Sequence, residues 1–202
     1  MASNRSFRIA MWALVALCAA TFAYVQFQGG SYKSAPIVFG APFKLTSTKG
    51  GELDLATLKG TPYGIFFGFT QCPEVCPTTL NDMSVAMKEL GEPAKNFRLL
   101  FVTVDPDRDT QDVMRDYISN FDPRIEGLIP TDQELQKVAK DFHIYYKKVA
   151  TSDGGYTMDH TATLFLFDAN GNLKSTVSFD EDKATRMEKL RKLLAGPLPA
   201  QG

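Results

Sequence analysis

The sequence predicts an α/β fold in which a mixed sheet is flanked by helices. Two observations predict it. Short apolar runs typical of buried strands alternate with segments whose apolar residues recur at helical spacing. The alternation closes with a hairpin signal, Asn170-Gly171, and a last helical segment. A further apolar stretch near the N-terminus stands apart, so the 202 residues predict one domain of ordinary size with an N-terminal appendage.

The appendage has the features of a membrane anchor. Ile9 to Phe27 contains no charged residue, and Arg5 and Arg8 precede it. As a helix this stretch is about 28 Å long, close to the thickness of the hydrocarbon core. The positive-inside rule leaves the N-terminus in the cytoplasm and exports the domain. A cleaved signal peptide and a lipoprotein signal at Cys18 are alternatives, and an uncleaved anchor is favoured because the small-residue pattern for cleavage is poor.

We therefore expect four parts along the chain. Residues 1–28 form a cytoplasmic N-terminus and transmembrane anchor, 29–36 a flexible tether, 37–196 the folded domain and 197–202 a C-terminal tail. The formal net charge of −1 becomes about −3 without the two anchor arginines. A mildly acidic domain has no basic surface for a polyanion, so nucleic acid is not an expected partner.

The first half of the domain predicts a hairpin and a strand–helix–strand unit. Alternating residues around Lys49-Gly50-Gly51 indicate an N-terminal β-hairpin at one edge of the domain. The buried strands and the helix between them are predicted at Tyr63 to Phe69, Thr78 to Leu90 and Arg98 to Val104. This order implies parallel strands joined by a right-handed crossover.

The second half continues the alternation. Its predicted elements are a helix at 111–121, a strand at 125–129, a helix opened by the capping box Thr131 to Glu134, a strand edge at 145–149, a Gly-rich loop at 151–156, strands at 162–167 and 173–179, and a helix at about 182–194 with Asp180 as its N-cap. The whole is thioredoxin-like in outline, with helices on both faces of the sheet.

Two cysteines occupy the turn from the first buried strand into its helix. Cys72 and Cys76 lie in Gly68-Phe69-Thr70-Gln71-Cys72-Pro73-Glu74-Val75-Cys76-Pro77, and Pro77 suits a first helical turn. The positive end of the helix favours thiolates, so we expect both sulfurs to be partly exposed and more acidic than free cysteine. Such a pair either cycles between dithiol and disulfide or binds a soft metal ion.

A histidine near the two cysteines would favour metal binding over a redox role, because it can supply a third ligand. His143 ends a helix and is expected to have a structural or surface role. His160 follows Asp159 and directly precedes a buried strand, where it is either a core histidine or a ligand. Thioredoxin-type reductases carry Cys-x-x-Cys and a cis-proline facing it, whereas this chain has a longer Cys spacing and Met158-Asp159-His160 in place of that proline.

Two thiolates and one imidazole favour copper(I) and leave copper(II) plausible. Zinc is disfavoured because it prefers a closed shell of four ligands. Asp159 is a candidate to orient His160 from outside the metal shell, although it could equally only cap a turn. Met83, Met87 and Met158 are expected to pack in the core, and the acidic stretch at 105–110 is expected to be a turn with a helix N-cap because a calcium loop would need glycine at position 110.

Three motifs in this order resemble the Sco/SenC copper chaperones. They are Gly68 to Pro77, Val104-Asp105-Pro106-Asp107-Arg108-Asp109-Thr110 and Asp159-His160-Thr161, behind a single anchor. The resemblance covers about Phe39 to Leu194. It implies a thioredoxin-like fold, copper bound by Cys72, Cys76 and His160, and Asp159 as the neighbouring functional acid. The family often has histidine or tyrosine where Gln71 stands and aspartate where Glu74 stands.

The resemblance also implies partners and a location. It predicts delivery of copper to the binuclear copper site of cytochrome c oxidase subunit II. Further expected partners are an upstream periplasmic copper donor and a thiol reductant for the cysteines. The expected location is the bacterial inner membrane with the domain in the periplasm, or the mitochondrial inner membrane facing the intermembrane space. A thiol-disulfide oxidoreductase that keeps the oxidase cysteines reduced, a redox or copper sensor, and a peroxidase using Cys72 are the alternative functions.

Overall fold

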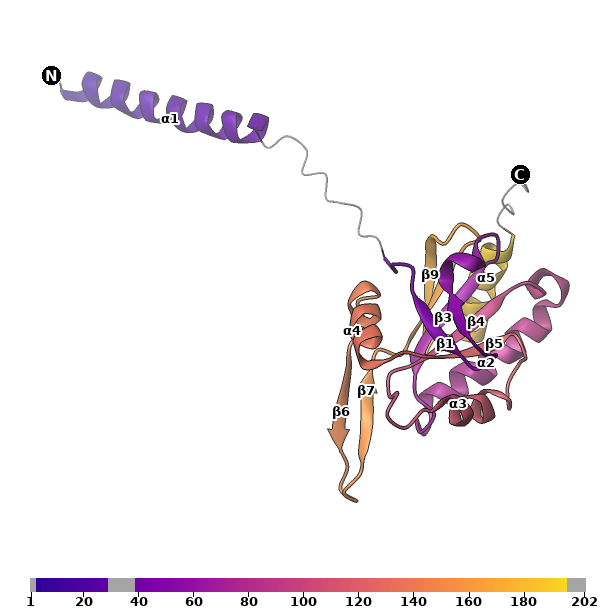
Figure 1. Ribbon diagram of the computed structural model, residues 1–202. Coiled ribbons are helices and arrows are strands. Elements are labelled where there is room, and N and C mark those ends of the chain that lie inside the picture. Colours follow the sequence, from indigo (N-terminus) through magenta and orange to yellow (C-terminus); the bar gives the residue numbers. More distant parts are fainter. Residues whose placement is uncertain (1–2, 29–38, 196–202) are drawn as a thin grey trace. The chain divides into compact units, whose positions relative to one another are not determined.

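The computed structural model describes residues 3–28 and 39–195, which fall into two units (Figure 1). The first unit contains one helix, α1 (Ser3–Gln28). Its Arg5–Tyr24 stretch has a mean hydropathy of 1.7 and is long and apolar enough to cross a membrane. The predicted tether and C-terminal tail, and the outermost residues of the predicted domain, lie outside the described residues.

A seven-stranded mixed sheet forms the centre of the second unit (Figure 1). The strand order is β2-β1-β5-β4-β3-β8-β9. Strands β3, β4 and β5 are parallel, and the remaining pairs are antiparallel. The bounds are β1 Lys44–Ser47, β2 Glu52–Asp54, β3 Tyr63–Gly68, β4 Arg98–Thr103, β5 Ile125–Ile129, β8 Thr163–Phe167 and β9 Leu173–Ser178. The thioredoxin-like α/β prediction, including the N-terminal hairpin β1–β2, is confirmed.

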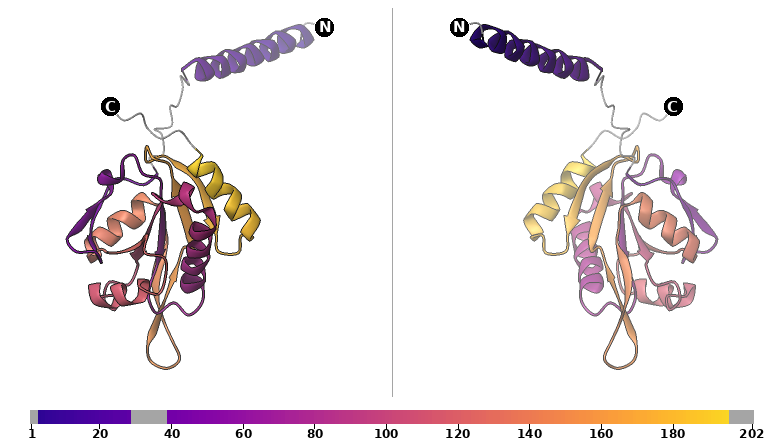
Figure 2. Two further views of the ribbon diagram at one scale, coloured as in Figure 1. Left: turned by 90° about the vertical axis from the view of Figure 1, so that its right-hand side faces the viewer. Right: turned by 90° about the vertical axis from the view of Figure 1, so that its left-hand side faces the viewer.

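Helices cover both faces of this sheet. The bounds are α2 Val75–Leu90, α3 Gln111–Ile118, α4 Asp132–Asp141 and α5 Lys183–Leu194, with short 3-10 turns at Leu55–Leu58 and Glu92–Ala94. Helices α2, α3 and α5 contribute to one hydrophobic core and α4 to the other. Figure 2 shows α2 and α5 on the opposite side of the sheet from α4.

Strand β3 separates these two cores because its residues alternate between them. All six of its residues are buried. Phe66 packs into the core with α2 and α5, whereas Ile65 and Phe67 pack into the core with α4. Since each fully buried phenylalanine contributes about 1.5–3 kcal/mol, the strand that leads to the cysteines is firmly held.

A second, two-stranded sheet was not predicted. It pairs β6 (Tyr146–Ala150) with β7 (Tyr156–His160) antiparallel, and Tyr146 lies opposite His160. The hairpin projects from the domain in both figures (Figures 1 and 2). The sequence indicated only a strand edge at 145–149, since Thr157 and Asp159 interrupt the apolar pattern of β7.

Three local predictions need correction. Helix α2 begins at Val75, three residues before the predicted start, so Cys76 lies inside its first turn. Asp182, not Asp180, caps α5 by accepting from the Thr185 N–H, while Asp180 accepts from the Ser178 hydroxyl. Helix α3 ends at Ile118 and not at Phe121. The capping box of Thr131 and Glu134 is confirmed.

Candidate metal centre

The fold brings the cysteines and His160 to one edge of the main sheet. Strand β3 ends at Gly68, and the turn that follows carries Cys72 and Cys76. Strand β8 runs antiparallel to β3, with Leu164 opposite Phe66, so the start of β8 lies at the end of β3. His160 stands three residues before β8 and therefore reaches the cysteine turn from a distant part of the sequence.

The three side chains form a compact set of donors. Their ligand atoms all lie within 4.8 Å of one another. Three ligands spaced evenly around one ion, with bonds of roughly 2.0–2.3 Å, are about 3.5–4.0 Å apart. Adjustments of a fraction of an ångström would therefore let one metal ion contact all three. The site is built from two soft sulfurs and one imidazole, a donor set that suits copper.

Cys72 is the acidic member of the cysteine pair. It is half-buried, and its sulfur accepts the backbone N–H of Cys76 at 3.3 Å, in the first turn of α2. The hydrogen bond with the Cys76 side chain, followed by those with His160 and with the backbone of Cys76 and Glu74, lowers the pKa of Cys72 to about 4. The expected acidic, partly exposed thiolate is thus present at Cys72.

Cys76 departs from the expectation of two exposed, acidic sulfurs. It is completely buried between β3 and α2. Its hydrogen bond to Cys72 and its burial raise the pKa of the Cys76 thiol above the ordinary value. One negative charge is already present on Cys72, and a second one in a buried position is unfavourable. A metal ion bound by both sulfurs would therefore have to displace the Cys76 proton.

His160 presents its Nε2 to the sulfurs. This atom lies 3.8 Å from Cys76 Sγ. The other ring nitrogen, Nδ1, lies 3.2 Å from the Thr161 carbonyl oxygen, which can only accept. Nδ1 is accordingly assigned a proton. Without a metal, Nε2 donates to the Cys72 thiolate, and it would give up that proton to offer its lone pair to a metal ion. Phe69 meets the imidazole edge to face, with 5.7 Å between ring centroids, and limits its rotation.

Asp159 lies next to His160 in the sequence, but its side chain does not point toward the sulfurs. Its neighbours Met158 and His160 lie on the face of β7 that meets the domain, and side chains alternate along a strand. The Asp159 side chain is exposed, and the nitrogen it was expected to orient faces the Thr161 carbonyl instead. A role for Asp159 in the chemistry of the site stays a prediction.

The loop after β4 supports the cysteine turn, and the sequence reading missed this role. Asp109 is fully buried and accepts from the Thr70 N–H at 3.0 Å, the Thr70 hydroxyl at 2.5 Å and the Thr103 hydroxyl at 2.5 Å. Burial raises the pKa of this carboxyl, and its hydrogen bonds oppose that rise. The acidic stretch directly after a parallel strand was the available signal, since such strand ends share one edge of the sheet.

Gly68 makes room for the buried sulfur. A Cβ at this position would lie 2.6 Å from Cys76 Sγ and 2.6 Å from the Phe101 ring. Both distances are far below van der Waals contact, so the close packing of β3 against α2 requires glycine here.

The other residues considered from sequence lie away from the donors. His143 follows α4 and stacks obliquely on Phe39, with 5.9 Å between ring centroids. Met83 and Met87 are buried in the core beneath α2, and Met158 is buried in the opposite core, as expected.

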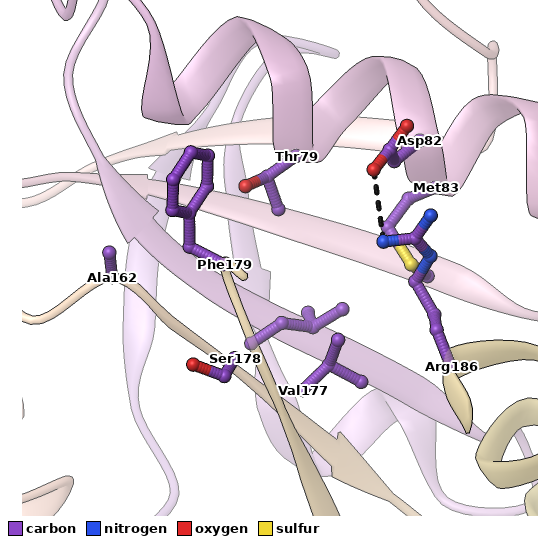
Figure 3. Close-up of a pocket in the computed structure, with 9 residues that line it drawn as sticks. Thr79, Asp82, Met83, Ala162, Val177, Ser178, Phe179 and Arg186 are labelled. Atoms are coloured by element: carbon purple, nitrogen blue, oxygen red, sulfur yellow. Dashed lines mark ion pairs between the residues drawn. The ribbon is translucent and has the colours of Figure 1, made fainter. Parts of the chain in front are cut away.

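A small pocket beside α2 does not form part of the metal centre (Figure 3). Figure 3 shows Arg186 of α5 reaching Asp82 of α2, an ion pair of 2.9 Å, with Phe179 and Ala162 at the other end. Its volume of about 10 Å³ is sufficient for no more than a water molecule. The pocket therefore marks how α2, α5 and the start of β8 pack together.

Comparison with known proteins identifies the family. The sequence profile described as SCO1/SenC matches residues 32–195, most of the chain. The chain belongs to the SCO1/SenC family. A SCO2-like protein of Rickettsia conorii is 33% identical over 157 residues, which cover 77% of this chain and 77% of the relative. Protein SCO1 homolog, mitochondrial, of Homo sapiens is 33% identical over 137 residues, 66% of this chain and 46% of that relative.

Solved structures of SCO1/SenC relatives have the same fold. ScoI of Bradyrhizobium japonicum, solved with copper bound, is 41% identical, with a TM-score of 0.70 over 77% of this chain and 99% of that one. Yeast Sco1, also solved with copper bound, is 29% identical, with a TM-score of 0.71 over 81% of this chain and 92% of that one. Copper is thus a ligand of homologous structures, and Cys72, Cys76 and His160 form the cluster that could bind it here.

Proposed function

We propose that this protein is a membrane-anchored copper chaperone that delivers copper to the binuclear copper site of cytochrome c oxidase subunit II. One observation carries the proposal: Cys72, Cys76 and His160 place three donor atoms within 4.8 Å of one another. Copper-bound relatives and the yeast relative named Protein SCO2, mitochondrial, 28% identical over 98% of this chain, support it.

The donor set suits transient binding of copper(I). Two thiolates hold the soft ion, and a third, neutral donor completes a low coordination number. A three-coordinate ion leaves space for an incoming thiolate, so copper can pass to a docked acceptor by ligand exchange without change of oxidation state. After transfer, Cys76 takes up a proton again, since its buried thiol is the less acidic of the pair.

The helix α1 provides the anchor in this proposal. With Arg5 and Arg8 before the apolar stretch, the domain faces the periplasm of a bacterium, or the intermembrane space of a mitochondrion. A periplasmic copper donor would load the site and a thiol reductant would keep Cys72 and Cys76 reduced. Protease treatment of sealed membranes tests this orientation, because digestion of the domain from the cytoplasmic side would contradict it.

Anaerobic titration of the full chain in detergent with copper(I), in competition with a chelator, tests the binding step. His160→Ala is expected to weaken copper binding by orders of magnitude, because one of three ligands is removed. His143→Ala is the matched control and should bind as wild type. Equal affinity of wild type and His160→Ala would discard the three-ligand site.

The delivery step needs a separate experiment. The copper(I)-loaded protein is mixed with a copper-free soluble domain of oxidase subunit II, one electron is then removed with ferricyanide because two copper(I) ions are colourless, and the absorption spectrum of the binuclear centre is followed. Spectral development that depends on Cys72 and Cys76 is expected. Persistent copper retention by the chaperone, with no spectrum of the acceptor, would contradict delivery to subunit II.

A thiol-disulfide oxidoreductase is the second candidate function. The observation that favours it is the half-buried, acidic Cys72 with Cys76 four residues away. Reduction of the acceptor's copper-ligand disulfide would convert Cys72 and Cys76 into a disulfide and return two thiols to the acceptor. Turnover by copper-free protein that survives His160→Ala would favour this function, since a dithiol reductase needs no imidazole donor.

A further inference from the structure

The hairpin that carries His160 belongs to a different sheet from the strand that leads to the cysteines. Among the strands that the structure describes, β6 and β7 pair only with each other, whereas β3 lies inside the seven-stranded sheet. The position of the imidazole relative to the sulfurs therefore depends on contacts between the hairpin and the rest of the domain. Met158 supplies an apolar contact on the inner face. Polar contacts to the hairpin come from the loop at 105–110, and within that loop Arg108 bonds both the hairpin and the cysteine turn.

Arg108 joins three segments through a single guanidinium group. Its Nε donates to Asp105 Oδ2 at 2.5 Å within the loop after β4. Its Nη1 donates to the backbone oxygen of Tyr156 in β7 at 2.8 Å, and to Gln71 Oε1 in the cysteine turn at 3.1 Å. The planar fork of donors makes this geometry available to arginine and not to lysine.

Aromatic contacts reinforce the same junction. The Arg108 Cζ lies 3.7 Å from the Tyr156 ring centroid and 6.0 Å from that of Phe69, the ring that meets His160. The Tyr156 hydroxyl donates to Asp105 Oδ1 at 2.9 Å. Asp105 is almost fully buried, so these contacts are weakly screened by solvent.

The loop that carries Arg108 also holds the cysteine turn. Asp109 bonds Thr70, one residue before Gln71, as described above. A second, peripheral contact pairs Asp107 with Lys148 of β6. The loop at 105–110 is thus a common frame to which the cysteine turn and the histidine hairpin are both attached.

From these contacts we propose that Arg108 is a positioning residue, which holds the β6–β7 hairpin against the cysteine turn so that His160 Nε2 stays within reach of the metal. The inference rests on the proposed role of His160 as a copper ligand. The hydrogen bonds and ring contacts of Arg108 described above go to Asp105, Gln71, Tyr156 and Phe69 and not to the donor atoms, so its effect on copper binding passes through His160.

A double-mutant cycle in the full chain in detergent tests this inference. Arg108→Lys keeps the charge but not the fork, and we expect copper(I) affinity to fall by about 10- to 100-fold, as for other groups that orient metal ligands. X-ray absorption should show both sulfur neighbours retained and the nitrogen neighbour lost or weakened. In a His160→Ala background the same substitution should cost no further affinity, because the residue it positions is absent.

Arg115→Lys is the matched control. Arg115 lies on α3 and bonds Asp112 and the Thr48 carbonyl, away from the hairpin, so copper affinity should not change. Should Arg108→Lys fail to fold, as judged by thermal unfolding, Tyr156→Leu removes the stacked ring from the hairpin side and takes its place in the cycle. Tyr156→Phe keeps the ring and should preserve most of the affinity.

Two results would overturn the inference. One is wild-type affinity and an unchanged nitrogen neighbour in Arg108→Lys. The other is an equal loss of affinity with and without His160, which would show a general structural effect. A His160→Ala protein that binds copper as wild type would instead refute the three-ligand site itself, so the two failures are distinguishable.

Discussion

The cysteine side and the histidine side of the metal centre differ in how they are supported. Cys76 is completely buried between β3 and α2, in a position that requires glycine at residue 68. His160 lies at the end of a two-stranded sheet that pairs with no other described strand, and its hairpin is held by Met158 and by contacts to the loop at 105–110.

This difference in support suggests how one site can bind copper selectively and still release it. Groups built into a core move only when the core opens, which costs much of the free energy of unfolding. A peripheral hairpin moves at a smaller cost, because fewer buried contacts are broken. We expect the sulfurs to keep a fixed geometry and the imidazole to be the ligand that leaves first when copper is exchanged.

The largest effect should come from the buried sulfur. Cys76→Ser replaces a soft donor with a hydroxyl that binds copper(I) poorly, and we expect affinity to fall on the order of a thousandfold or more. Chelator competition measures it. Cys18→Ser, in α1, is the matched control and should bind as wild type. A loss of less than about tenfold in Cys76→Ser would show that the rigid side is not the main source of affinity.

The acidity of the two sulfurs separates them further. Because the pKa of Cys72 is lowered to about 4, its thiolate is fully formed from pH 6 to pH 8. The alkylation rate of Cys72 in the reduced, copper-free Cys18→Ser protein should be flat over this range, whereas an ordinary thiol rises roughly tenfold per pH unit.

Iodoacetamide labelling followed by mass spectrometry measures both cysteines. In Cys72→Ser the remaining domain thiol should react slowly at all these pH values, because Cys76 is buried. A Cys72 rate that climbs with pH up to pH 8 would contradict the lowered pKa.

Substitution of two glycines tests how rigidly Cys76 is held, and we expect moderate effects on stability. Gly68→Ala forces a methyl group against Cys76 Sγ, and Gly127→Ala forces one to 2.4 Å from Met114 Cγ, in the core. Each should lower the free energy of unfolding by about 1–3 kcal/mol in urea titrations. Only Gly68→Ala should also reduce copper affinity. Equal copper binding by the two variants would argue against a rigidly fixed Cys76.

The smallest effect is expected for Asp159→Asn. The Asp159 side chain is exposed and Nδ1 of His160 faces the Thr161 carbonyl, so the copper affinity should change by no more than about threefold. Chelator competition and the rate of transfer to subunit II should both be measured. A larger loss of affinity would place Asp159 nearer the donors than the structure does, and a change in transfer rate alone would support its predicted role in function.

The fold was predictable because its strands are long apolar runs. Buried strands are strongly predicted at Tyr63 to Phe69 and at Arg98 to Val104. The capping box at Thr131 clearly marks the start of its helix. Strand β7 was missed because Thr157 and Asp159 are polar and Gly154-Gly155 precedes it. Its stability comes from Tyr156, Met158 and His160 facing the domain, a tertiary effect that alternation over five residues cannot reveal.

The site was predictable in its residues but not in its electrostatics. Cysteine spacing indicated a soft-metal or redox pair, and the resemblance to the Sco/SenC family added His160, which position alone left open as a core histidine; the fold brings these three side chains together. Both sulfurs were expected to become more acidic at the helix N-terminus, but Cys76 is buried beside a charged Cys72, and this raises the pKa of its thiol. Asp109 and Arg108 looked like ordinary turn residues, since their partners Thr70, Gln71 and Tyr156 are distant in sequence.

Cys72 packs against the core with α4 and also against the core with α2 and α5. A change at this one residue, whether a bound ion or a disulfide, would therefore affect the packing on both faces of the sheet. We expect amide exchange in both helical layers to slow on loading. The loaded and the copper-free domain would then differ in rigidity at surfaces far from the metal.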